Sequence, residues 1–298
     1  MVRVTVVGVG AGVNSGGAGS VQGGGAVGRG ETGPDFVEAL ARGLDVIKAF
    51  RPGRPTMTLS EVAAEAGLAR PTARRFLLTL QQLGYVRADP SGFALTPRVL
   101  ELGTAYVESL ALWDVARPHM EALVAKTNES TSIAQLDGSD VVYVARVAVP
   151  KIVALSVTIG TRFPALQTSL GKVLLAALSD DEVDAVLAEP SRSGIEPLRT
   201  PTRDERTAVL CEVRARGWAL SDEELARGIR SVAAPLRDGR GRVVAALNVN
   251  AHAGETSLER LTCEHLPALL TAAANVSADF ARLASVPHAT APATVRTS

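Results

Sequence analysis

Apolar residues recur at helical spacing in three consecutive segments near the start of the chain. In the first segment, Phe36, Leu40, Leu44 and Ile47 lie three or four residues apart. This spacing predicts an amphipathic helix that ends before the next Pro-Gly pair.

Two further helices are predicted next, separated by a glycine. Thr58, with Glu61 three residues later, has the pattern of a capping box, in which each side chain bonds a backbone N–H group of the other residue. Gly67 allows the positive φ of a tight turn. The third helix is then predicted from about Arg70 to Leu83, with a glycine directly after it.

A small β-hairpin follows the third helix. Residues 85–87 and 93–95 alternate in polarity around the turn sequence Asp-Pro-Ser-Gly. Three helices followed by a hairpin are typical of a winged helix-turn-helix, which we assign to residues 35–97.

The remainder of the chain interleaves strand-like and helical patterns. Linker helices are expected over residues 98–128. Alternation predicts strands at 130–135, 141–147, 153–159, 232–236 and 243–249. Helical spacing predicts helices at 171–178, 180–187, 205–216 and in a final segment ending near residue 283. We therefore expect an α+β protein whose second domain, of mixed α/β type, occupies residues 129–284.

Composition distinguishes both ends of the chain. The first 33 residues hold 12 of the 27 glycines and cannot bury enough apolar surface to offset their ordering entropy. We expect a disordered arm over residues 1–34 and a loose tail over 285–298.

The Gly-rich stretch 8–13 is similar to a dinucleotide-binding fingerprint, but Val13 stands where the third glycine belongs. A translation start near Asp35 is an alternative explanation of the arm.

Charge is balanced over the whole chain but not over the winged helix. The 31 Lys and Arg residues equal the 31 Asp and Glu residues, so only local clustering can attract nucleic acid. Residues 70–98 contain five arginines and one acid, an excess of +4. Three of these arginines lie off the apolar stripe of the third helix, where they either solvate the helix or read DNA. Their combination with a glycine turn and a hairpin favours DNA.

We therefore predict that the partner is a double-stranded DNA operator. Arginines of the third helix can bond guanine edges in the major groove, whereas an arginine in the wing is expected to meet phosphate. The predicted DNA-binding residues are Arg70, Pro71, Thr72, Arg74, Arg75 and Arg87.

Motifs for catalysis or metal binding are not recognisable. The two cysteines support neither a disulfide framework nor a zinc site, and the four histidines have no metal-ligand spacing. Gly171-Lys172 lacks the rest of a phosphate loop, and Ser169 lacks the glycine of a nucleophile elbow. We expect no enzyme activity, no cofactor and no metal. Because no apolar run approaches ~20 residues, we also expect no membrane partner and a cytoplasmic location.

From Asp35 to about Leu283 the sequence resembles the IclR-type transcriptional regulators. The matching segments of the second domain are 160–164, 169–172 and 217–231. Segments 36–44 and 72–80 are similar to the branch that controls protocatechuate and β-ketoadipate pathway genes. The resemblance implies a GAF-like effector-binding domain and a homodimer or a dimer of dimers. Ala69 departs from the family, which often has a serine there to cap the recognition helix.

The resemblance also implies where a small organic acid binds. The effector-binding residues are then Ser169, Leu170, Asp222, Ser231, Asn248 and Asn250. Ser169 begins a predicted helix whose N-terminal amides favour an anion. The two asparagines are two apart on a strand and face one side, although a solvated strand face would show the same pattern. Arg146 and Arg162 either add positive charge to this site or pair with surface acids.

These features predict a DNA-binding transcriptional regulator that is controlled by a small organic acid, such as protocatechuate or β-ketoadipate. The genes it regulates are expected to serve the breakdown of aromatic compounds. The alternative is a small-acid sensor or enzyme that carries a vestigial DNA-binding module. The sequence does not distinguish an activator from a repressor, because both use the same DNA contacts.

Overall fold

The computed structural model describes residues 33–51, 53–103, 112–150 and 157–285. The chain divides near residue 110 into two compact units, and each is described by itself. The first unit comprises the described residues up to 103, and the second unit begins at residue 112. The arm predicted for 1–34 and the tail predicted for 285–298 lie almost entirely outside the described residues.

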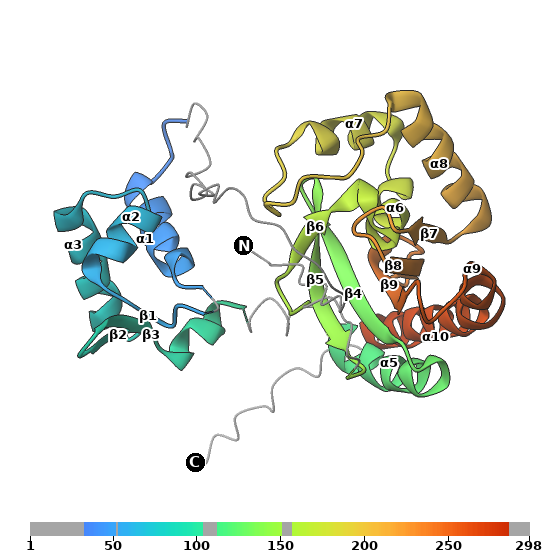
Figure 1. Cartoon of the computed structure of the whole chain (residues 1–298), viewed down its shortest axis with the longest axis horizontal. Helices are drawn as coiled ribbons and strands as arrows, with labels where there is room; N and C mark the ends of the chain where they lie inside the picture. Colours follow the sequence, from blue (N-terminus) through green and yellow to red (C-terminus); the bar gives the residue numbers. More distant parts are fainter. Residues whose placement is uncertain (1–32, 52, 104–111, 151–156, 286–298) are drawn as a thin grey trace, which may run out of the picture. The chain divides into compact units, whose positions relative to one another are not determined.

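The first unit is a three-helix cluster with a small sheet (Figure 1). In chain order, its elements are α1 (Glu38–Ala49), β1 (Thr56–Met57), α2 (Leu59–Glu65), α3 (Arg70–Gln82), β2 (Val86–Asp89) and β3 (Gly92–Leu95), and a short 3₁₀ turn (Pro97–Leu100) follows. The core is formed by apolar side chains of all three helices together with Met57 and Val86. The predicted winged helix-turn-helix is therefore confirmed.

Local chemistry explains the ends of these helices. Thr58 and Glu61 form the predicted capping box, in which the Glu61 carboxylate accepts from the Thr58 backbone N–H at 2.8 Å. Gly67 has the expected positive φ, of 63°. Ala69 precedes α3 and makes no side-chain capping bond, as its methyl group requires.

A third strand in the wing was not predicted. β1 pairs antiparallel with β3, so the order in the small sheet is β1-β3-β2. A Cβ atom at Gly92 would lie 2.2 Å from the Met57 carbonyl oxygen, so β1 can approach only because position 92 is glycine. At two residues, β1 is too short for an alternation pattern to reveal it.

The second unit is built on an antiparallel sheet of six strands in the order β6-β5-β4-β9-β8-β7. The central strands are β4 (Ser130–Asp137), β5 (Asp140–Val147), β8 (Ile229–Arg237) and β9 (Val243–His252). The edge strands β6 (Arg162–Pro164) and β7 (Ala219–Asp222) were not predicted, because each is short. Most of the strand predicted at 153–159 lies outside the described residues, and 157–159 form no strand.

Helices cover both faces of this sheet (Figure 1). One face packs against α5 (Leu112–Thr127) and α10 (Leu266–Ser285), which a helical turn (Leu258–Arg260, α9) and a π-helical segment (Leu261–His265) precede. The other face packs against α6 (Ser169–Ala176), and α8 (Arg203–Arg216) and α7 (Asp180–Ala188) lie on that side. The predicted combination of a winged helix-turn-helix with a mixed α/β domain is confirmed.

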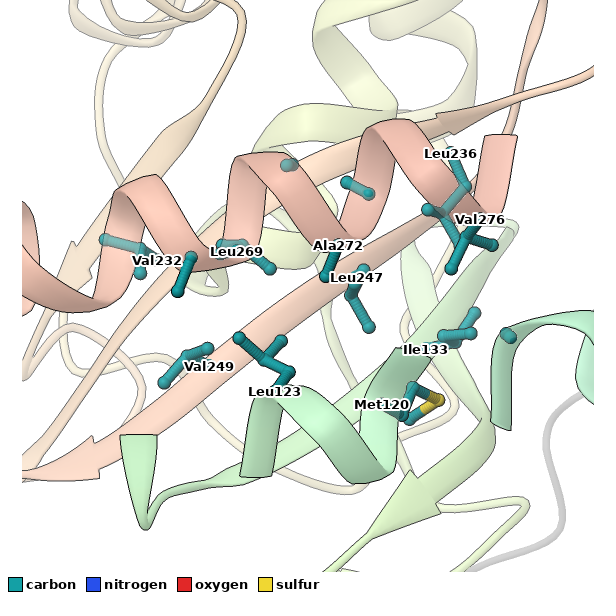
Figure 2. Close-up of a cluster of buried hydrophobic side chains, with 14 of the residues drawn as sticks. Met120, Leu123, Ile133, Val232, Leu236, Leu247, Val249, Leu269, Ala272 and Val276 are labelled. Atoms are coloured by element: carbon teal, nitrogen blue, oxygen red, sulfur yellow. The ribbon is translucent and has the colours of Figure 1, made fainter. Parts of the chain in front are cut away.

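The α5 and α10 side of the sheet is entirely apolar at its centre. Figure 2 shows Met120 and Leu123 of α5 and Leu269 and Val276 of α10 directed toward strand residues such as Leu247. These side chains are almost completely buried. Helix α5, which we expected to be part of a linker, is thus part of the core of the second unit.

A β-bulge interrupts the pairing of β4 with β5. Ile133 faces Ala145 but Ala134 faces Tyr143, so Val144 is an extra residue on β5. Val144 and Ala145 both pack on the α5 and α10 side, whereas Tyr143 packs on the α6 side. Strict alternation resumes at Arg146.

Among the described helices, none is long and apolar enough to cross a membrane.

Candidate DNA interface and effector site

The arginines of α3 lie on the face of the helix that points away from its core. Ala73, Leu77 and Leu80 are buried, at three- and four-residue spacing, against the rest of the first unit. The predicted DNA-binding residues of this helix lie outside that stripe. Of these, Thr72 is half-buried, and the exposed ones are Arg70, Pro71, Arg74 and Arg75.

The arginines on this face are available to a binding partner. In the part of the chain that the structure describes, no carboxylate lies within 4.0 Å of Arg70, Arg74 or Arg75. Other arginines of the unit are paired, for example Arg42 with Glu38. The first turn of α3 contains no acid. A helix face with three unpaired cations suits the phosphates and guanine edges of DNA.

Arg87 in the wing differs from the arginines of α3. Its guanidinium donates to Asp89 at 3.0 Å, and Asp89 also accepts from the Ser91 hydroxyl and backbone N–H groups. These hydrogen bonds, those from Ser91 first, hold the pKa of Asp89 below its usual value. Arg87 therefore carries a local counter-charge and helps to fix the hairpin turn.

In the second unit, the register of the sheet aligns polar side chains on its α6 side. Directly opposed residues of an antiparallel sheet share one face. One row runs from Arg146 on β5 through Ser132 on β4 to Asn248 on β9. The neighbouring row consists of Ser130, Asn250, Ser231 and Ser221. We call the two rows together the polar cluster.

Hydrogen bonds connect the polar cluster to α6. The hydroxyl groups of Ser169 and Ser231 are 2.7 Å apart, and the Asn248 side-chain oxygen accepts from the Ser132 backbone N–H at 3.0 Å. Asn248 is only 3% exposed, so this is not a solvated strand face. Leu170, the second residue of α6, is fully buried beside them. The structure thus brings together five of the six predicted effector-binding residues.

Asn250 differs from its neighbours because its side-chain oxygen has no partner in the described part of the chain. Its Oδ1 atom is buried and, among the described residues, receives no hydrogen bond. A buried acceptor without a donor is unfavourable by about 1–3 kcal/mol, so such an atom marks a place where a ligand can bond.

Asp222 does not join the polar cluster. It pairs with Arg230, which in turn pairs with Ala251, one residue out of step with Ser221 and Ser231, so it lies on the opposite face of the sheet. Its carboxylate accepts a hydrogen bond from Arg230. That ion pair holds the turn between β7 and β8.

Arg146 and Arg162, for which the sequence left open a role in the site or a surface ion pair, have different surroundings. Arg162 is paired with Asp137 and with the buried Asp140, so its charge is neutralised. Arg146 is half-buried and donates to the Ser132 hydroxyl at 3.2 Å, and no described carboxylate lies within 4.0 Å of it. Burial lowers the pKa of Arg146, because desolvation disfavours its charged form. Sequence reasoning missed both Ser130 and Ser132, although their two-residue spacing on the strand predicted at 130–135 places them on one face.

Comparison with known proteins decides the family. The model of the IclR helix-turn-helix domain matches residues 39–90, and that of the bacterial transcriptional regulator IclR C-terminal domain matches residues 104–278. The chain belongs to the IclR family. The family consists of transcriptional regulators that bind DNA through the helix-turn-helix, and the predicted family and DNA-binding function are thereby confirmed.

Several IclR relatives are similar over most of their length. The Pca regulon regulatory protein of Pseudomonas putida is 37% identical over 80% of this chain and 82% of its own. A transcriptional regulator from Rhodococcus sp. RHA1 is 48% identical, with a TM-score of 0.73 over 83% of this chain and all of that one. An IclR homolog from Microbacterium hydrocarbonoxydans, complexed with 4-hydroxybenzoate, is 25% identical, with a TM-score of 0.72 over 83% of this chain and all of that one.

Proposed function

We propose that this IclR-family regulator controls genes for the breakdown of aromatic acids and responds to a small aromatic carboxylic acid. The observation that carries the proposal is the polar cluster beside α6, with an unpaired side-chain oxygen at Asn250 and a cation at Arg146. The names of two relatives agree with it. One regulates a Pca regulon, and the other is complexed with 4-hydroxybenzoate.

The effector is held by the predicted residues that share one face of the sheet and the start of α6. These are Ser169, Leu170, Ser231, Asn248 and Asn250. Asp222 acts indirectly, since its ion pair with Arg230 fixes the β7–β8 turn next to Ser231.

On the DNA side, we assign base reading to the unpaired arginines of α3. A bidentate arginine–guanine contact supplies about 1–3 kcal/mol of discrimination between bases. Thr72 and Pro71 border the same first turn, and Arg87 meets phosphate. As a cytoplasmic homodimer or dimer of dimers, the regulator would bind half-sites about 34–36 Å apart, one turn of the double helix.

Regulation follows if the acid binds one arrangement of the second unit better than another. The segment 98–128 would then transmit the difference to the spacing of two DNA-reading units.

The test combines DNA binding with thermal stability. The purified full chain is titrated with 4-hydroxybenzoate, protocatechuate or β-ketoadipate, with benzamide as a neutral control. Operator affinity is measured by fluorescence anisotropy on a DNA fragment from the upstream intergenic region. An effector at 100 times its Kd should stabilise the protein by about 2.7 kcal/mol and change its operator affinity. If neither aromatic acid changes either quantity, the proposed function is wrong, and a response to β-ketoadipate alone would show that the effector is not aromatic.

A further inference from the structure

We infer that Arg146 binds the carboxylate of the effector and that Asn250 accepts a hydrogen bond from a hydroxyl group at the other end of the same molecule. The two residues then determine which acids are recognised: aromatic monocarboxylates with a hydroxyl group opposite the carboxylate. The inference rests on the proposed function, because it assumes that the polar cluster is the effector site.

Arg146 needs an anion that the described protein does not supply. Its guanidinium is half-buried, and the Ser132 hydroxyl, 3.2 Å away, is a neutral partner. A desolvated cation with no counter-ion is unfavourable. Arg162, on the adjacent strand, shows the contrasting case, since two aspartates surround it. The free cation of the cluster is therefore Arg146, and a carboxylate matches its planar donor groups.

Asn250 needs a donor. The other hydroxyl groups of its row are occupied: Ser130 accepts from the Val149 backbone N–H at 3.0 Å, and Ser231 is bonded to Ser169. The buried Oδ1 atom of Asn250 remains free. A hydroxyl group can satisfy this acceptor, because its O–H group donates.

The register of the sheet sets the distance between the two groups. The Arg146 side chain reaches across one strand to Ser132, which faces Asn248. Asn250 lies on β9, two strands from Arg146 on β5 and two residues further along, so the two backbones are about 12 Å apart. An aromatic ring with substituents at opposite ends, hydrogen-bonded at each end, fits this span. Tyr143 and Phe163, which meet edge to face at 5.5 Å between ring centroids, form an aromatic pair on the same side of the sheet.

Matched ligands and variants test the assignment. Isothermal titration of the full chain uses 4-hydroxybenzoate, its neutral amide 4-hydroxybenzamide, and benzoate, which lacks the hydroxyl group. Arg146→Met removes the cation but keeps a long side chain, and Arg146→Lys keeps the charge. Arg162→Met is the control, because that arginine is already paired. Circular dichroism checks that each variant is folded.

For Arg146→Met, we expect about 10- to 100-fold weaker binding of 4-hydroxybenzoate, little change for the amide, and partial recovery with lysine. Asn250→Ala should remove the preference for 4-hydroxybenzoate over benzoate. Equal losses for the acid and the amide, or a loss with Arg162→Met and none with Arg146→Met, would overturn the assignment of Arg146. An unchanged preference in Asn250→Ala would overturn that of Asn250. If the wild-type chain binds none of the three compounds, the inferred recognition is wrong, whereas the proposed function is decided by the titration with protocatechuate.

Discussion

Gly171 in α6 lies against the backbone of Ala165, so closely that a Cβ atom at position 171 would come 2.0 Å from the Ala165 carbonyl oxygen. Helix α6 can therefore begin beside the polar cluster only because position 171 is glycine, which has no side chain.

Gly171→Ala should displace α6 and destabilise the second unit by about 1–3 kcal/mol, the usual effect of overpacking. Because Ser169 begins the same helix, effector binding should weaken as well. Thermal unfolding and titration measure both effects. Gly239→Ala is the control, since a Cβ atom there meets Ala281 at an ordinary 3.6 Å. Equal melting temperatures for the two variants would show that α6 adapts without strain.

Arg75→Ala tests whether α3 reads bases. The side chain is exposed and unpaired among the described residues. We expect a loss of about 1–3 kcal/mol on the operator and a smaller loss on unrelated DNA. Anisotropy at several salt concentrations measures both, with Arg42→Ala, whose arginine pairs with Glu38, as a control. The same loss on every sequence would instead identify a phosphate contact.

Thr58→Ala should destabilise the first unit by about 1 kcal/mol, because it removes the side-chain bond to the Glu61 backbone N–H. Urea unfolding of the full chain measures the change in the transition of this unit. Ser60→Ala, at an exposed position inside the same helix, should have less effect. A larger effect at Ser60 would contradict the importance of the capping box.

Stability should fall in acid, in part through three capping boxes. In each box, hydrogen bonds, first from the backbone N–H of Thr58, Ser179 or Thr202, lower the pKa of a glutamate below 4.5. These glutamates are Glu61, Glu182 and Glu205. Their contribution is thus fully present above pH 4.5 and is lost as the pH falls through the lowered values.

Replacing all three glutamates by glutamine tests this pH dependence. Glutamine keeps the capping geometry but does not titrate, so urea midpoints should decline less steeply between pH 5.5 and pH 3. Glu259→Gln, an exposed position outside any capping box, should leave the slope unchanged. Equal slopes for the triple variant and the wild type would show that other carboxylates control acid unfolding.

What the sequence predicted well is local. The capping box at Thr58, the turn at Gly67 and the exposed arginines of α3 follow from residues within a few positions of one another. The edge strands β6 and β7 escaped prediction because strands of three or four residues exist only through their long-range pairing. Whether Arg146 or Arg162 carries a free charge depended on Asp137 and Asp140, which only the fold brings to Arg162.

The extra residue at Val144 has a consequence for how such a sensor can change. If β5 alternated strictly from Tyr143, Arg146 would face the hydrophobic core under α5 and α10. A cation there would contact neither water nor a ligand. Inserting or deleting one residue between Tyr143 and Arg146 would therefore abolish the proposed response to the acid, although every residue proposed to contact the effector would still be present. Under the proposed function, ligand response therefore depends on the number of residues along one strand as much as on their identity.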